Sequence, residues 1–175
     1  TLPVLHINNV VMFPYLLMPL VVSDDESKLV IDHALSQDKT MAFFLEKDKT
    51  EPNDIGLYEI GTSVTILRML RNQDGSISLL LQGTSRIRMQ KVVQREPFIM
   101  VDVESIVESS VEDTEIHAYR TIAVELMEKI AQESTVLNAE MIAGLNSIKQ
   151  AGRVADIIAG NLELQTEDRQ IILEA

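Results

Sequence analysis

The residue types that most often carry out chemistry are few in this chain and lie far apart. Its three histidines, His6, His33 and His117, show no paired metal-ligand spacing. We expect structural roles for them, on the surface or in packing. Ser147 and Lys149 are close in sequence, but a Ser–Lys catalytic pair needs a buried lysine, and this region has the pattern of an exposed helix end. The sequence therefore predicts no catalytic residue and no metal site.

Other catalytic and cofactor-binding motifs are missing from the sequence too. It contains neither a glycine-rich phosphate loop with its lysine nor a Gly-x-Ser-x-Gly elbow. It also has no cysteine, which excludes disulfides and thiolate chemistry and is typical of a reducing, cytoplasmic location. The carboxylate pairs Asp24-Asp25 and Glu112-Asp113 lie where helices are expected to begin, so capping is favoured over general acid–base chemistry. We expect no cofactor in this chain.

The net charge argues against two classes of partner. Acidic residues number 27 and basic residues 15, which gives a formal charge of -12. Nucleic-acid binding needs a basic surface that releases counterions from phosphates, and anionic membranes repel an acidic protein. The longest apolar run, residues 10–22, contains Pro14 and Pro19 and is too short to span a bilayer. We therefore expect neither nucleic acid nor a membrane as a partner.

Strand patterns dominate the first 110 residues. The Asp74-Gly75 dipeptide predicts a tight hairpin turn between residues 63–70 and 76–82, and Gly83 suggests a bend before the next strand. One helix is expected to begin at Asp24 or Asp25. Six or more short strands with one helix predict a small, partly closed barrel. Further strands are expected at residues 1–7, 10–13, 41–45, 86–93 and 98–106.

Helical periodicity replaces the strand pattern after about residue 110, and no proline follows Pro97. Ser109 and Glu112 form a plausible capping box before the first helix, and Asn138 is a plausible cap for the second. Further helices are expected from about residues 152 and 166. The predicted domains are residues 1–110 and residues 111–175, in an α+β chain. The first helix is expected to carry one apolar stripe formed by Ile116, Tyr119, Ala123, Leu126 and Ile130.

Apolar residues with no obvious place in a core are the remaining candidates for a site. Leu16, Leu17 and Met18 lie between Pro14 and Pro19, in a stretch that fits neither a regular helix nor a central strand. They either plug the barrel or form an exposed loop that contacts unfolded polypeptide. The second interpretation suits methionine, which is an adaptable contact residue.

Leu80 is the other candidate, because it belongs to the polar face of its expected strand. Ser76, Ser78 and Gln82 share that face, while Ile77, Leu79 and Leu81 form the opposite, apolar one. Leu80 is either covered by a neighbouring strand or loop or exposed to solvent. The candidate substrate-binding residues are therefore Leu16, Leu17, Met18, Pro19 and Leu80.

Several motifs, in their order and spacing, resemble the N-terminal domain of the ATP-dependent Lon protease family. The resemblance covers nearly the whole chain. Asp54 to Thr62 resembles the family's Asp-Leu-Tyr-x-x-Gly-Thr pattern with an insertion, and Gly83-Thr84-Ser85-Arg86 matches its Gly-x-x-Arg. The remaining matches are Leu2-Pro3-Val4-Leu5, Val10-Val11-Met12-Phe13-Pro14, Pro19-Leu20, Leu145-Asn146-Ser147-Ile148, Arg153 to Ala159 and Gln170 to Glu174.

The resemblance implies a PUA-like β-barrel followed by a helical bundle, without catalytic activity of its own. It further implies recognition of unfolded or damaged protein substrates and assembly into a homohexamer. The parent protein would carry an ATPase module, with ATP and Mg²⁺, and a Ser-Lys endopeptidase module beyond the end of this chain. A stand-alone adaptor or small-ligand-binding domain of the same fold is the alternative. A Walker motif downstream would favour the protease.

Overall fold

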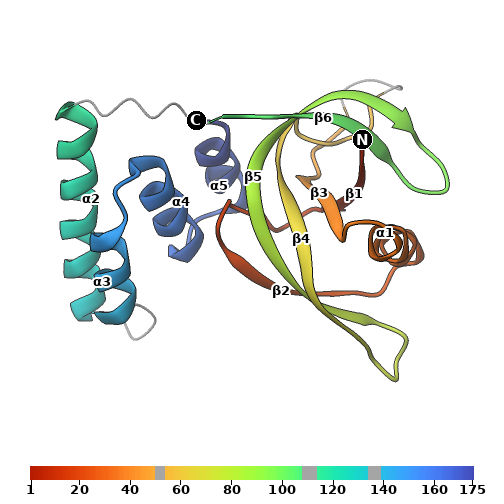
Figure 1. Cartoon of the computed structure of the whole chain (residues 1–175), viewed down its shortest axis with the longest axis horizontal. Helices are drawn as coiled ribbons and strands as arrows, with labels where there is room; N and C mark the ends of the chain where they lie inside the picture. Colours follow the sequence, from red (N-terminus) through yellow and green to blue (C-terminus); the bar gives the residue numbers. More distant parts are fainter. Residues whose placement is uncertain (50–53, 108–113, 134–138) are drawn as a thin grey trace. The chain divides into compact units, whose positions relative to one another are not determined.

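The computed structural model describes residues 1–49, 54–107, 114–133 and 139–175 (Figure 1). The chain forms two compact units, one made of Thr1–Ile106 with Gln165–Ala175 and the other of Val107–Leu164. The first unit contains β1 (Leu2–Ile7), β2 (Leu17–Val22), α1 (Asp25–Ser36), β3 (Thr40–Leu45), β4 (Ile60–Arg71), β5 (Ile77–Gln94), β6 (Met100–Ser105) and α5 (Thr166–Glu174). The second contains α2 (Thr114–Glu133), α3 (Ala139–Ser147) and α4 (Ala151–Asn161).

The strands form one mixed sheet that closes on itself. Its order is β2-β5-β4-β3-β1-β6, and β6 also pairs with β5, so five strands make a ring and β2 pairs with the first part of β5. Among the strand pairs of the described residues, only β1–β3 is parallel. Figure 1 shows β4 and β5 as long curved ribbons that run side by side. The predicted α+β class, a barrel-like strand unit with one helix followed by helices, is confirmed.

The principal core lies between α1 and one side of the sheet. Val30, Ile31 and Ala34 of α1 are buried with Leu5, Phe43 and other strand residues. Every residue of β3 after Thr40 is buried, which matches the uninterrupted apolar run Met41–Leu45. The core therefore rests on a strand that is buried on both faces, together with one amphipathic helix.

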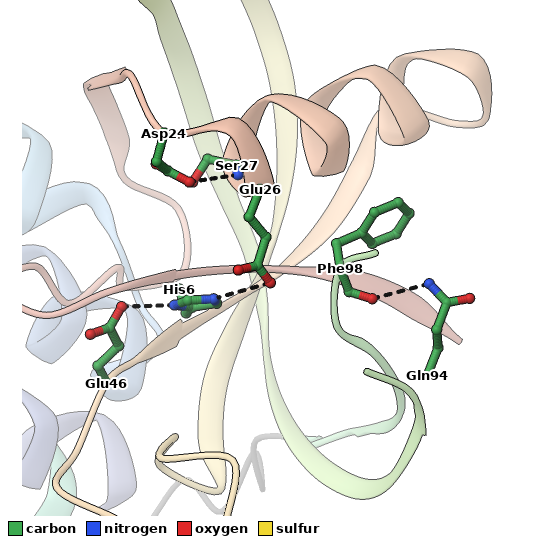
Figure 2. A network of polar contacts seen from close by, with 7 residues as sticks. All are labelled: His6, Asp24, Glu26, Ser27, Glu46, Gln94 and Phe98. Carbon is green, nitrogen blue, oxygen red and sulfur yellow. Dashed lines mark hydrogen bonds and ion pairs between the residues drawn. The ribbon is translucent and has the colours of Figure 1, made fainter. Parts of the chain in front are cut away.

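His6 connects β1 to two neighbouring segments (Figure 2). Its Nδ1 lies 2.7 Å from the Glu46 carboxylate just after β3, and its Nε2 lies 3.7 Å from the Glu26 carboxylate in α1. Asp24, also drawn there, accepts a hydrogen bond from the backbone N–H of Ser27 at 2.8 Å. These contacts fix the start of α1 over the end of β1.

The hairpin joining β4 and β5 is built as the sequence predicts. Gly75 takes a positive φ of 82°, which favours glycine, and Asp74 accepts hydrogen bonds from both the backbone N–H and the hydroxyl of Ser76. The Ser76 hydroxyl and then its N–H lower the pKa of the Asp74 carboxyl below its usual value. The turn therefore holds a fixed conformation through hydrogen bonds from its own residues.

Two of the strand predictions are wrong. Residues 10–13 are not a strand, although Val11 to Phe13 are buried, and the Met12 carbonyl accepts a hydrogen bond from the Thr62 hydroxyl at 2.6 Å. Gly83 does not separate two strands either, because β5 runs through it from Ile77 to Gln94. A Cβ at Gly83 would collide with the Phe13 carbonyl. This glycine therefore allows a close approach of two backbones within a continuous strand, beside the register shift that pairs Ser63 with Ser85 and Val64 with Gly83.

The helices of the second unit pack α2 against α3 and α4. Their core contains Val124, Met127, Ile142, Leu145 and Val154. The Arg120 guanidinium donates hydrogen bonds to the carbonyls of Ile148 and Leu145, at 2.9 and 3.2 Å, which ties α2 to the end of α3. The predicted caps at Ser109–Glu112 and Asn138 lie outside the described residues. No helix in the part of the chain that the structure describes is long and apolar enough to cross a membrane.

Candidate polypeptide-binding surface

Strand β2 is an edge strand that pairs with β5 alone, as far as the described residues show. Its start is fixed by two backbone hydrogen bonds of 2.9 Å, from Tyr15 N–H to the Gly83 carbonyl and from Gly83 N–H to the Leu16 carbonyl. Pro19 lies in the middle of this strand, where it has no N–H to offer. Proline is tolerated here because β2 is an edge strand, and it discourages pairing with another strand.

The strand register aligns outward-facing residues of β2, β5 and β4 in three rows. Cross-strand partners share a face of a sheet, so each row lies on one side. The rows are Leu17–Gln82–Thr65, Pro19–Leu80–Arg68 and Val21–Ser78–Leu70. We name the five apolar members of these rows the apolar strand face: Leu17, Pro19, Val21, Leu70 and Leu80.

Most of the apolar strand face is open to solvent. Leu17 is 57% exposed, and Val21 and Leu70 are each 64% exposed. Pro19 is also exposed, and Leu80 is half-buried. Leu80 and Leu70 help to line a shallow hollow, together with Arg68, Met69, Ser78 and Leu79. The result is a contiguous apolar surface with a concave part, a feature that marks sites of protein interaction.

Of the five candidate residues selected from the sequence, three lie on the apolar strand face and two do not. Pro19 and Leu80 are direct cross-strand partners, and Leu17 lies two positions along the same face. Met18 points the other way and packs against the principal core, and Leu16 is half-buried just before β2. From Leu17 the stretch is an edge strand, whereas the sequence left two alternatives open, a plug of the barrel and an exposed loop. Alternation along this strand is the physical reason that Met18 is separated from Leu17 and Pro19.

Sequence reasoning missed Val21 and Leu70. Both lie in predominantly apolar runs, LMPLVV and ILRML, in which Val21 and Leu70 do not differ in type from core residues. Counting every second position from Leu17 in an edge strand selects Val21. Leu70 follows only from the register across the hairpin, because the ladder between β4 and β5 shifts between Ile66 and Arg68.

The residues considered first for chemistry are divided between the two units, with His6 and His33 in the first and His117, Ser147 and Lys149 in the second. Among the described residues, no three His, Cys, Asp or Glu side chains form a group suited to a metal ion. Ser147 is exposed, and its hydroxyl donates to the Gly144 carbonyl of its own helix at 2.7 Å. His33 packs near the ring of Phe98, at 5.2 Å between centroids. In the part of the chain that the structure describes, the apolar strand face is therefore the best-supported candidate site.

A family model for the ATP-dependent protease La (LON) substrate-binding domain matches residues 1–175. The chain belongs to this family. It is 34% identical to Lon protease 2 of Bdellovibrio bacteriovorus and 33% identical to the Lon protease of Geobacter metallireducens, in each case over 99% of the chain. It spans only 22% of the length of either relative.

Solved structures of Lon N-terminal domains share the fold. The domain from the Mycobacterium avium complex superposes with a TM-score of 0.78 at 20% identity, over 98% of this chain and 89% of that one. The domain from Xanthomonas campestris superposes with a TM-score of 0.71, also at 20% identity, over 99% and 89%. The chain therefore has the architecture of a Lon N-terminal domain throughout.

Proposed function

We propose that the chain recognises unfolded or damaged polypeptides for a Lon-type ATP-dependent protease, and that the apolar strand face is the surface that binds them. The observation that carries this proposal is the alignment of Leu17, Pro19 and Leu80 with two further exposed residues on one sheet face. Matching the family's substrate-binding domain supports the same role. Unfolded chains expose apolar side chains that a folded protein buries, so an apolar surface binds unfolded chains in preference to folded proteins.

The geometry of the face fits an extended segment of polypeptide. The rows lie on neighbouring strands and present their apolar groups outward, so a segment lying across them contacts several side chains at once. Pro19 removes a backbone donor from the edge strand, which weakens recognition by strand addition. Binding through side chains places few demands on the sequence of the bound segment, as a quality-control protein requires.

Exposed members of the face allow binding to be tested separately from folding. Replacing Leu17 and Val21 with Ser should weaken binding of a reduced, carboxymethylated protein by about fivefold to tenfold, because apolar contact area is lost. The melting temperature should change little, because both side chains are exposed. Fluorescence anisotropy and thermal unfolding measure the two effects.

Val93 supplies a matched control and Met18 a contrasting one. Val93→Ser removes an exposed apolar side chain of β5 outside the three rows and should leave binding unchanged. Met18→Ser should lower the melting temperature, because Met18 packs against the core. Unchanged affinity in the Leu17→Ser/Val21→Ser variant would refute the proposed surface.

The proposal extends to the parent protein. A Lon-type protein would supply the ATPase and Ser-Lys peptidase modules, form a homohexamer and act in the cytoplasm, while this chain would be non-catalytic. A stand-alone adaptor or small-ligand-binding domain is the competing function. A Walker motif in the downstream reading frame supports the protease, and its absence there would favour the adaptor.

A further inference from the structure

Basic residues are concentrated on the strands that form the apolar strand face. Strands β2, β4 and β5 contain no Asp or Glu, although the chain as a whole has 27 acidic and 15 basic residues. Their basic residues are Arg68, Arg71, Arg86, Arg88 and Lys91. The exposed apolar residues therefore lie on the one group of strands whose own charge is positive, within an acidic protein.

Arg68 is the basic residue placed within the three rows. It is exposed, and it is the cross-strand partner of Leu80, which in turn faces Pro19. Arg68 also lines the hollow beside Leu80. Arg71, by contrast, forms an ion pair with Asp32, and the Nε of Arg86 donates to the Leu173 carbonyl at 3.0 Å. Within the described part of the chain, the Arg68 guanidinium has neither an ion pair nor a hydrogen bond.

We propose that Arg68 selects segments in which an acidic residue lies beside apolar ones, which adds a charge preference to the polypeptide binding proposed above and rests on it. A guanidinium binds a carboxylate through two parallel hydrogen bonds, so it favours this group over a neutral amide. A lysine in the same position of the segment would be repelled. Apolar contacts provide most of the affinity, and Arg68 provides specificity between otherwise similar segments.

The acidity of the whole protein does not override this local preference. At physiological salt the field of a surface charge decays over about 8 Å, so distant carboxylates are largely screened. A contact between Arg68 and a bound carboxylate acts within about 4 Å, where screening is weak. Apolar groups around the contact also exclude water and strengthen it.

Three fluorescein-labelled peptides with the same leucine-rich sequence test the proposal, each with Glu, Gln or Lys at its central position. Wild-type chain should bind the Glu peptide about threefold more tightly than the Gln peptide and more tightly still than the Lys peptide. Arg68→Gln should abolish the difference between Glu and Gln. Arg68→Glu should reverse the order, so that the Lys peptide binds best. Circular dichroism verifies that each variant is folded.

Arg88→Gln is the matched control, because Arg88 is an exposed arginine of β5 outside the three rows. Arg88→Gln should preserve the preference for the Glu peptide. If Arg88→Gln and Arg68→Gln lost this preference equally, only the net charge of the chain would matter, which would contradict a specific role for Arg68. Equal binding of the three peptides by wild-type chain would overturn the charge preference and leave the apolar surface intact. Failure of the wild-type chain to bind any of them would instead refute the proposed function.

Discussion

Asp24 shows how one carboxylate sets the beginning of an element. It occupies the N-cap position of α1 and accepts the Ser27 N–H at 2.8 Å. Partial burial raises the pKa of this carboxyl, but hydrogen bonds, chiefly from the backbone and side chain of Ser27, act against burial, and its pKa is lowered overall. The ionised carboxylate therefore stabilises the folded state, and His6 nearby acts in the same direction.

The lowered pKa of Asp24 predicts an acid-dependent contribution to stability. A carboxyl whose folded pKa is depressed contributes fully above its unfolded pKa of about 3.9, and the contribution is lost as pH falls through the folded pKa. Asp24→Ala should cost about 0.5–2 kcal/mol of unfolding free energy at neutral pH and less at about pH 3. Urea unfolding at both pH values measures this difference.

Asp24→Asn separates the hydrogen bond from the charge. Asparagine caps helices as well as aspartate does, so stability at neutral pH should be nearly preserved. The variant should, however, lack the part of the acid dependence that Asp24 contributes. Equal acid sensitivity of wild type and Asp24→Asn would show that other carboxylates determine the effect.

Helix α2 carries two apolar faces, and the sequence identifies the outer one. Four of the five residues in the predicted stripe, Ile116, Tyr119, Leu126 and Ile130, are exposed. The face that packs against α3 and α4 instead contains Val124 and Met127. Periodicity locates apolar residues on a helix but does not indicate which of two adjacent apolar faces meets a neighbour.

Neighbouring residues of α2 provide a direct test of this assignment. Met127 is 2% exposed, whereas Leu126 is 52% exposed. Met127→Ala should cost about 2–5 kcal/mol because it removes a buried side chain, and Leu126→Ala should cost much less. Chemical denaturation of the two variants gives both values, and a comparable cost for Leu126→Ala would mean that the outer face is covered in solution.

Local signals in the sequence predicted those elements that depend on neighbouring residues alone. The Asp24 cap, the Asp74-Gly75 turn and the apolar run of β3 each follow from a few adjacent residues. Residues 10–13 resemble a strand but pair with no strand in the described part of the chain, and Gly83 resembles a break but allows a close backbone contact. Pairing across the sheet depends on distant residues, which a local pattern does not contain.

The candidate site likewise depends on pairing between strands that are distant in sequence. Leu17 and Pro19 were selected because they belong to a proline-containing stretch, and Leu80 because it lies on the polar face of its expected strand. Their alignment into rows depends on β2 pairing with β5 across about sixty residues of chain, and the shifted register of β4 brings Arg68 beside Leu80. The position of Met18 on the inner face follows from the same register.

At the scale of the whole molecule, the chain leaves the strand unit and returns to it. Helix α5 belongs with the strands in one compact unit, although α2, α3 and α4 separate it from them in sequence. The Gln170 amide donates to the Ile60 carbonyl at 3.0 Å, and the Leu173 carbonyl accepts from Arg86 at the same distance. The expected division into residues 1–110 and 111–175 remains a prediction, and α5 provides a way to test it.

A buried and an exposed residue of α5 distinguish the two possibilities. Leu173 and Ile171 lie on the same helix, but only Leu173 is buried. Leu173→Ala should therefore destabilise the strand unit by about 2–5 kcal/mol, and Ile171→Ala should have little effect. Amide hydrogen exchange resolves where the loss occurs, because faster exchange in β4 and β5 with unchanged protection in α2, α3 and α4 means that α5 stabilises the strands. Faster exchange in α2 to α4 alone would support a domain running from residue 111 to 175 instead.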